Sequence, residues 1–267
     1  MNETSKDSSK APMILERRGQ IAEMVRRNGS VRVGELAERF RVSEVTIRLD
    51  LVALEKEGEL MRDRGGAIAQ RLLVPVQSLM GMELRSQLNN DSKKRIGQAA
   101  AQFVQPGDTI ILDAGTTVVE MVPFLAGIEH LTVVTNALNV ALALNEKTTA
   151  KVLLLGGNLS RESCSTLGPI GERTLADMVV QKTFLGAQAL DIRHGITDST
   201  PEIAQSKRAM IHAARKVVLL VDSSKWGRGA FIKVAPVGAV HTLISDGGLP
   251  GEARTSLEQS GVELILA

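Results

Sequence analysis

The sequence predicts two domains of different class: a small, mainly helical N-terminal domain and a larger C-terminal α/β domain built on an open sheet. Residues 13–69 carry apolar residues at helical spacing and dense charge, and they end in a short hairpin pattern. From about Asp108 onward, short β-branched runs alternate with helical stretches, which is typical of an open α/β sheet. We expect domains over 13–70 and 91–267, a linker over 71–90 and a disordered tail over 1–12.

The composition predicts a globular protein with an aliphatic core. A chain of 267 residues has the length of one or two domains at roughly 150 residues each. Hydrophobic residues make up 43% of the chain but aromatic residues only 2%, so Leu, Val, Ile and Ala must fill the core. The formal net charge of +2 is too small to indicate a nucleic-acid partner by itself.

The cysteine count and the hydropathy pattern exclude several classes of protein. Cys164 is the only cysteine, so the chain has neither a disulfide framework nor zinc-finger spacing, and a reducing compartment is expected. No apolar run is long enough to cross a membrane, and Met1–Pro12 lack the apolar core of a signal peptide. We expect a cytoplasmic protein without a metal, a cofactor or a membrane partner.

Three helices are predicted in the first domain. The first ends at Asn28-Gly29, and the third begins after Ser43, whose side chain is a good N-cap, and ends at Gly58. The apolar residues at helical spacing are Ile14, Leu15, Ile21, Met24 and Val25 in the first helix, Leu36, Ala37 and Phe40 in the second, and Ile47, Leu51 and Leu54 in the third.

A β-hairpin is predicted after the third helix. Leu60–Arg62 and Ala67–Ala69 flank Asp63-Arg64-Gly65-Gly66, which supplies a glycine turn. Three helices followed by a hairpin form the layout of a winged helix-turn-helix domain.

The outer face of the third helix is the candidate surface for contacting DNA, because its apolar face packs inward. Arg48 can donate a bidentate pair to guanine or hold a phosphate, and the hairpin arginines can contact the backbone or the adjacent minor groove. A generic packing module with solvated arginines is the alternative, since residues 14–71 hold 12 Arg and Lys against 10 Asp and Glu. The predicted DNA-binding residues are Ser43, Glu44, Val45, Thr46, Arg48, Leu49, Arg62 and Arg64.

The second domain is predicted to hold a parallel sheet covered by helices, because most of its strand candidates are nearly continuous in Val, Ile and Leu. The strand candidates are 109–112, 131–134, 152–155, 183–185, 217–221, 243–244 and 262–266. The helix candidates are 93–104, 117–125, 137–144, 171–178, 202–214 and 252–260.

Polar and glycine-rich turns follow these strands, at the edge of the sheet where ligands of open α/β folds bind. Glycine lets the backbone approach a phosphate, threonine adds amide and hydroxyl donors, asparagine binds hydroxyls and lysine supplies a charge. Each residue alone also fits a cap, a tight turn or a solvated charge, but their succession predicts a pocket for a phosphorylated, hydroxyl-rich ligand. The predicted ligand-binding residues are Asp113, Gly115, Thr116, Thr117, Thr135, Asn136, Gly156, Gly157, Asp222 and Lys225.

Two sets of motifs resemble the DeoR family of transcriptional regulators. The first is the stretch Val42–Leu51 with Leu54-Glu55, Gly58, Arg62 and Gly65–Ala67, and with the lead-in Glu16–Arg18, Ile21 and Gly29–Val33. It resembles the family's DNA-binding signature, although many members carry a second arginine where this chain has Leu49. The second set is Lys93, Asp113–Thr117, Thr135-Asn136, Gly156-Gly157, Gly168, Lys207 and Asp222–Lys225.

This second set resembles the family's sensor domain, which is related in fold to ribose-5-phosphate isomerases and CoA transferases. The resemblance implies a repressor of a carbohydrate operon that binds double-stranded operator DNA as a dimer or tetramer and responds to a phosphorylated sugar. Within the family, the likeness is greatest to repressors of N-acetylgalactosamine and amino-sugar pathways.

Two other functions are compatible with parts of the sequence. A sugar-phosphate isomerase carrying a DNA-binding head would need a general base, for which Asp113, Glu202 and Asp222 are the candidates. The glycine-rich and acidic loops associated with ribose-5-phosphate isomerases are not apparent, so no catalysis is expected. The other alternative is a DNA-binding scaffold that no ligand controls.

Overall fold

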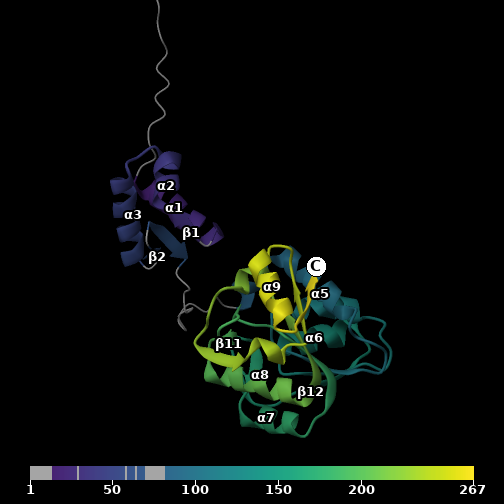
Figure 1. Ribbon diagram of the computed structural model, residues 1–267. Helices are drawn as coiled ribbons and strands as arrows, with labels where there is room; N and C mark the ends of the chain where they lie inside the picture. The colour runs from purple at the N-terminus through teal and green to yellow at the C-terminus, as the bar shows by residue number, and fades with distance from the viewer. Residues whose placement is uncertain (1–13, 29, 58, 64, 70–81) are drawn as a thin grey trace, which may run out of the picture. The chain divides into compact units, whose positions relative to one another are not determined.

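The computed structural model describes residues 14–28, 30–57, 59–63, 65–69 and 82–267 (Figure 1). The chain divides into two compact units, Met1–Arg71 and Leu72–Ala267, and each is considered by itself. The predicted tail, Gly58, Arg64 and most of the predicted linker lie outside the described residues. None of the described helices has the length and hydropathy that crossing a membrane requires.

The N-terminal unit contains the three predicted helices and the hairpin. The helices are α1 (Ile14–Asn28), α2 (Val33–Phe40) and α3 (Glu44–Lys56), and the hairpin strands are β2 (Leu60–Asp63) and β3 (Gly66–Ala69). A third strand, β1 (Ser30–Arg32), pairs antiparallel with β3 and was not predicted. Its three residues are too few to show the alternation of apolar and polar residues that marks a strand.

The predicted packing of the third helix is confirmed. Ile47, Leu51 and Leu54 are buried in the core of the unit, and the Ser43 side chain accepts a hydrogen bond from the Thr46 amide at 3.1 Å. The predicted first helix is confirmed and begins at Ile14, although Ile14 and Leu15 are exposed, whereas Ile21 and Val25 are buried. The first turn of α1 lies outside the apolar cluster that α1 forms with the other elements.

A buried ion pair joins α1 to α3. Asp50 on α3 accepts hydrogen bonds from Arg17 Nε at 2.7 Å and from Arg18 Nε at 2.9 Å. Only 6% of the Arg17 side chain and 3% of the Asp50 side chain are exposed. The carboxylate therefore fixes the orientation of α3 while the opposite face of the helix stays free.

The C-terminal unit contains the predicted parallel sheet of seven strands. The strand order is β15-β14-β12-β9-β4-β5-β6, and all neighbours in this order are parallel. Each strand overlaps its candidate range. The strands are β4 (Thr109–Leu112), β5 (Thr132–Thr135), β6 (Lys151–Leu154), β9 (Val180–Leu185), β12 (Ala214–Leu220), β14 (Thr242–Ser245) and β15 (Glu263–Leu266).

Helices cover both faces of this sheet, because successive strand residues point to opposite sides. One apolar cluster joins Ile110 and Val133 to α5, η2 and α6, and the other joins Ile111 and Val134 to α7, α8 and α9. The segment predicted as a helix over 117–125 is a 3₁₀ helix, and Pro123 inside it has no N–H to donate. The helices are α5 (Asn90–Ala101), η2 (Val119–Leu125), α6 (Leu138–Lys147), α7 (Pro169–Ala176), α8 (Pro201–Ala213) and α9 (Gly251–Gln259).

Short elements around the sheet were not predicted. β7 (Asn158–Ser160) and β8 (Ser165–Leu167) form a hairpin, and β10 (Ala189–Asp191), β11 (Gly195–Asp198) and β13 (Ile232–Ala235) form a small antiparallel sheet. Helix α4 (Met82–Gln87) lies inside the segment predicted as a linker. The one-turn 3₁₀ helices η3 (Ser223–Lys225) and η4 (Val237–Ala239) follow β12 and β13.

Candidate functional site

The candidate DNA-contacting face of α3 is exposed, as the sequence predicts. Val45 and Leu49 each leave 63% of their surface in solvent. Arg48 Nη2 donates to Glu44 Oε2 at 2.6 Å, one helical turn away, and both side chains are more than half exposed. An exposed pair of this kind stabilises a protein by at most about 1 kcal/mol, so Arg48 can exchange Glu44 for another acceptor at little cost.

The hairpin arginine Arg62 is held against the end of α3. Its backbone amide and its Nε donate to the two carboxylate oxygens of Glu55, at 2.9 Å and 2.7 Å. These hydrogen bonds, the backbone one first, lower the pKa of Glu55 below its ordinary value. Arg62 is thus placed beside α3, while Arg64 lies outside the described residues.

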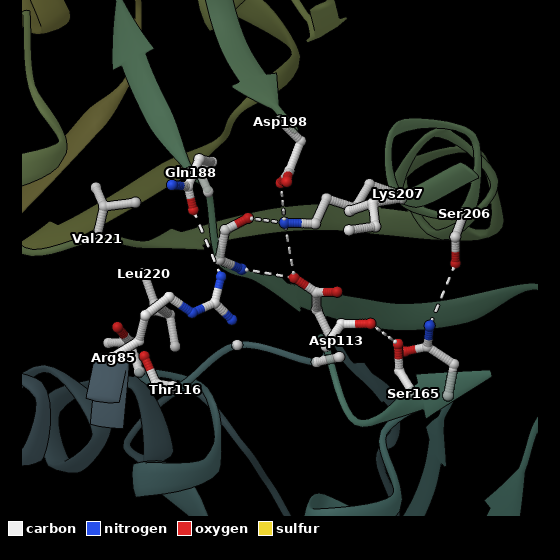
Figure 2. A pocket seen from close by; sticks show the side chains of 18 of the residues that line it. Arg85, Asp113, Thr116, Ser165, Gln188, Asp198, Ser206, Lys207, Leu220 and Val221 are labelled. Carbon is white, nitrogen blue, oxygen red and sulfur yellow. Dashed lines mark hydrogen bonds and ion pairs between the residues drawn. The ribbon is translucent and has the colours of Figure 1, made fainter. Parts of the chain in front are cut away.

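A pocket of about 650 Å³, part of it open to solvent, lies in the C-terminal unit (Figure 2). It lies past the carboxyl ends of β4, β5, β9 and β12, where ligands of open α/β sheets bind. Six of the predicted ligand-binding residues line it: Asp113, Gly115, Thr116, Thr117, Asn136 and Lys225.

The other four predicted ligand-binding residues do not line the pocket. Thr135 is fully buried, and its hydroxyl donates to the Leu112 carbonyl. Gly156 and Gly157 form the turn into β7, where a Cβ on Gly157 would lie 2.5 Å from the Leu167 carbonyl oxygen and φ is +146°. Asp222 caps η3 by accepting a hydrogen bond from the Ser224 amide.

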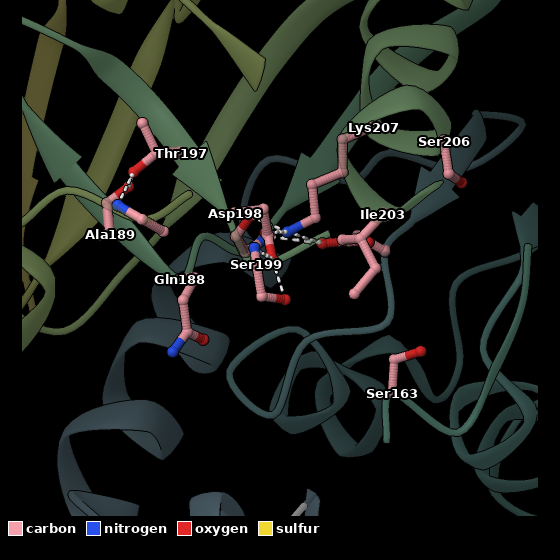
Figure 3. Close-up of polar contacts among 12 residues, drawn as sticks. Ser163, Gln188, Ala189, Thr197, Asp198, Ser199, Ile203, Ser206 and Lys207 are labelled. Carbon is pink, nitrogen blue, oxygen red and sulfur yellow. Dashed lines mark hydrogen bonds and ion pairs between the residues drawn. The ribbon is translucent and has the colours of Figure 1, made fainter. Parts of the chain in front are cut away.

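A buried lysine between two carboxylates forms the centre of the pocket. Lys207 Nζ on α8 lies 3.1 Å from Asp113 Oδ2 and 2.7 Å from Asp198 Oδ2, and it donates to the Gly186 carbonyl at 2.7 Å (Figure 2). Figure 3 shows Asp198, at the end of β11, approaching Lys207. Burial alone would lower the pKa of Lys207, but the two carboxylates outweigh it and raise that pKa.

Because three acceptors surround the Lys207 ammonium, its role in the protein without a ligand is to neutralise carboxylate charge. Asp113 Oδ2 also accepts the Gly186 amide at 3.0 Å, so the whole centre is held in one arrangement. The centre carries two carboxylates against one ammonium and therefore suits hydrogen-bond donors on a ligand.

A positively charged side faces this centre. Arg85 on α4 and Lys225 in η3 both line the pocket. Burial first, and then repulsion from Arg85 and Arg228, lower the pKa of Lys225 against the attraction of Asp222 and Asp198. The site therefore disfavours the protonated form of Lys225 until an anion compensates its charge.

The turn after β4 adds backbone donors to the same pocket. The Gly115 amide bonds to the Asp113 carbonyl, whereas the amides of Thr116 and Thr117 have no hydrogen-bond partner in the described chain. A Cβ on Gly115 would lie 3.2 Å from Val118 Cγ2, so the turn is tight. Free amides at a tight turn bind phosphate oxygens.

Hydroxyl and amide groups form the remaining wall. Asn136 donates to the Thr166 carbonyl at 3.0 Å, but its Oδ1 is buried and has no partner among the described residues. Ser163 and Ser165 share a hydrogen bond of 2.7 Å between their hydroxyls. An unpaired buried acceptor is costly, so the Asn136 carbonyl suits a hydroxyl or an amide of a bound molecule.

Sequence reasoning missed several polar residues of the lining. The sequence indicates Lys207 only through the family motif, although its place between the buried Ala204 and Met210 on one face of α8 is a usable signal. Arg85 was missed because its segment was assigned to the linker. The polar lining residues outside the predicted set are Arg85, Ser163, Ser165, Gln188, Asp198, Ser206 and Lys207.

Of the three carboxylates weighed for an isomerase, only Asp113 lines the pocket. Glu202 is exposed, Asp222 caps η3, and neither lines the pocket. Asp113 does line it but is paired with Lys207 and the Gly186 amide.

Sequence comparisons match both units. A model of the DeoR-like helix-turn-helix domain matches residues 17–71, and one of the DeoR C terminal sensor domain matches residues 88–247. The chain is 39% identical to the "Uncharacterized HTH-type transcriptional regulator YulB" of Bacillus subtilis strain 168, over 94% of this chain and 96% of that protein. It is 36% identical to the "Putative aga operon transcriptional repressor" of Escherichia coli O157:H7, over 94% and 93%.

Solved structures give more distant matches. The sorbitol operon regulator SorC of Klebsiella pneumoniae aligns over 95% of this chain and 100% of its own, with 13% identity and a TM-score of 0.38. A D-ribose-5-phosphate isomerase in complex with phospho-erythronic acid aligns over 51% of this chain and 54% of its own, with 16% identity and a TM-score of 0.39.

Proposed function

The chain belongs to the DeoR family of transcriptional regulators, and from this premise we propose that it is a homo-oligomeric repressor controlled by a phosphorylated sugar. It is a DNA-binding regulator and not an enzyme, as the resemblance in its motifs predicts. The regulated operon serves carbohydrate metabolism. The likeness to amino-sugar operon repressors makes an amino-sugar phosphate the first candidate ligand.

One observation supports a phosphorylated sugar as the ligand: the same pocket has a side suited to an anion and a side suited to hydroxyl groups. Arg85, Lys225 and the free amides of Thr116 and Thr117 supply the first side. The Asp113–Lys207–Asp198 centre and the Asn136 carbonyl supply the second. A sugar phosphate has one strongly anionic end and several hydroxyl donors, so it is complementary to both sides.

A thermal-unfolding panel of the full chain tests this proposal. Amino-sugar phosphates and other sugar phosphates are compared with inorganic phosphate and with the matching unphosphorylated sugars. A ligand at about 100 times its dissociation constant stabilises the folded protein by roughly 2.7 kcal/mol. We expect the phosphorylated sugar to stabilise the protein more than either of its parts, and equal shifts for sugar and sugar phosphate would contradict an anion site.

Replacing Lys225 by alanine tests the charged side of the pocket. A hydrogen bond to a charged group contributes about 1.5–3 kcal/mol, so Lys225→Ala should weaken binding of the effective sugar phosphate roughly 10- to 150-fold. Operator binding without ligand should stay as in the wild type. Calorimetric titration measures the affinity, with Lys216→Ala as control because Lys216 is an exposed lysine on β12. Unchanged affinity in Lys225→Ala would remove Lys225 from the binding site.

Replacing Arg48 by alanine tests the DNA-contacting face of α3. If Arg48 contacts a base, Arg48→Ala weakens specific operator binding by about 1–3 kcal/mol and relaxes the preference at one base pair. Binding is measured at several salt concentrations on a duplex selected from a random pool by the full chain. A reduced salt dependence with unchanged base preference would instead assign Arg48 to a phosphate.

The proposed repressor is a homo-oligomer that acts in the cytoplasm. Two helix-turn-helix domains related by a two-fold axis bind two half-sites of an operator, so we expect a dimer or a tetramer. A regulator of bacterial operons acts in the cytoplasm, and a single cysteine suits that reducing compartment. Sedimentation analysis of the full chain gives the oligomer directly, and a monomer at operator-binding concentrations would contradict this part.

A further inference from the structure

Helix α4 brings an arginine from the start of the C-terminal unit into the pocket. We infer that Arg85 binds the anionic group of the ligand and thereby makes the position of α4 depend on occupancy of the pocket. The inference rests on the proposed function, because it assigns the anion of that same ligand to a residue that the sequence patterns did not indicate.

Hydrogen bonds join α4 and the following turn to the rest of the unit. Lys93 Nζ donates to the Arg85 backbone carbonyl, and Arg85 Nη1 lies 3.5 Å from Gln188 Oε1. Asn89, with φ at +54°, donates from its side-chain amide to Asp222 Oδ1 at 3.0 Å. Leu88 in this turn is 47% exposed. Such contacts can rearrange without opening the apolar core.

Several cations lie close together where α4 meets the pocket. Burial lowers the pKa of Lys93, and repulsion from Lys225 and Arg85 adds to that shift against the attraction of Asp222 and Glu120. The same Arg85 charge also disfavours the protonated Lys225. An anion between Arg85 and Lys225 would replace this repulsion by attraction on both sides.

The chemistry of arginine suits this task. A guanidinium presents two parallel N–H donors that match two oxygens of a phosphate, so its binding fixes an orientation as well as a distance. Because Arg85 is on a six-residue helix, orienting its side chain constrains the whole helix.

Helix α4 lies close in sequence to the DNA-binding unit. Strand β3 of the N-terminal unit ends at Ala69, and α4 begins at Met82, so only residues 70–81 separate the two. Any shift of α4 therefore moves the point from which the DNA-binding unit is tethered. Binding of the ligand by Arg85 is in this way linked to the movement of the DNA-binding unit.

The test compares full-length wild type, Arg85→Ala and Arg85→Lys, with Arg173→Ala as a control at an exposed arginine of α7. The probes are inorganic phosphate and the sugar phosphate that stabilises the wild type most in the panel above. Thermal unfolding and calorimetry report binding, and hydrogen–deuterium exchange of peptides covering 82–89 reports the state of α4.

We expect the probe to stabilise the wild type and Arg173→Ala and to slow exchange across 82–89 in both. Arg85→Ala should still fold in the absence of the probe, bind it roughly tenfold more weakly or worse, and lose the slowed exchange. Arg85→Lys should bind better than Arg85→Ala, because it keeps the charge.

Two results would overturn the inference in distinguishable ways. Equal binding by Arg85→Ala and the wild type, or unchanged exchange across 82–89 in the wild type with the probe bound, would refute the role of Arg85 while leaving the sensor proposal standing. A wild type that no phosphorylated probe stabilises would refute both.

Discussion

Asp50→Asn should destabilise the N-terminal unit by about 3–5 kcal/mol, because it removes the carboxylate from a buried ion pair and leaves the cationic partner buried. Asp50 accepts from both Arg17 and Arg18, and the Arg17 side chain is 6% exposed. The substitution keeps the size of the side chain, so its effect reports the lost charge. Since this contact fixes α3 on α1, we also expect operator binding to be lost.

Hydrogen exchange of the full chain measures this effect separately in each unit. Amides over 14–69 should lose protection in Asp50→Asn, while those of the C-terminal sheet and the affinity for sugar phosphate stay unchanged. Glu44→Gln is the matched control, because Glu44 pairs with Arg48 at the surface and its loss should cost at most about 1 kcal/mol. Protection over 14–69 equal to that of the wild type would contradict the account of Asp50.

Lys207→Met should destabilise the C-terminal unit by about 3–5 kcal/mol, because two buried carboxylates lose the ammonium between them. Asp113 and Asp198 lie 3.1 Å and 2.7 Å from Lys207 Nζ. Ligand binding should also be lost, since repulsion between the carboxylates will displace Asp113.

Denaturant unfolding followed by fluorescence measures this loss, because the single tryptophan, Trp226, packs against the core of this unit. Lys216→Met is the control at an exposed lysine of β12. Asp198→Asn combined with Lys207→Met should recover part of the loss. A Lys207→Met variant as stable as the wild type at neutral pH would show that the carboxylates do not need the ammonium.

The raised pKa of Lys207 also fixes the pH range of its contribution in the wild type. Its ordinary value is 10.5, and the folded protein holds the proton more tightly than the unfolded chain does. The stabilisation is therefore fully present below pH 10.5 and is lost only as the pH rises through the raised value. Unfolding free energies measured between neutral pH and pH 10 should show no loss from this group.

The parallel sheet and the N-terminal unit were predictable because the sequence patterns that mark them are local and strong. Most of the sheet strands appear in the sequence as nearly continuous Val, Ile and Leu runs, and Ser43 followed by Ile47, Leu51 and Leu54 marks a capped helix with one apolar face. The short β10, β11 and β13 lack such signals. The pairing of β11 with β13 joins residues distant in sequence, such as Ile196 with Ala235.

The pocket was only partly predictable, because its parts come from separate elements. Asp113 to Thr117 and Asn136 directly follow strands, and parallel strands bring their carboxyl ends together. Asp198 and Arg85 come from β11 and α4, which the sequence did not reveal. Gly156 and Gly157 carry the same pattern as a phosphate-binding turn, yet the tertiary structure uses Gly157 for close contact with the Leu167 backbone.

Occupancy of the pocket is expected to change the affinity of the DNA-binding unit for its operator. The direct measurement is a titration of the selected duplex with the full chain, with and without saturating sugar phosphate, paired with a ligand titration with and without the duplex. We expect the ligand to change duplex affinity by roughly 5- to 150-fold and the duplex to change ligand affinity by the same factor. A ligand that binds tightly while duplex affinity stays constant would contradict the account.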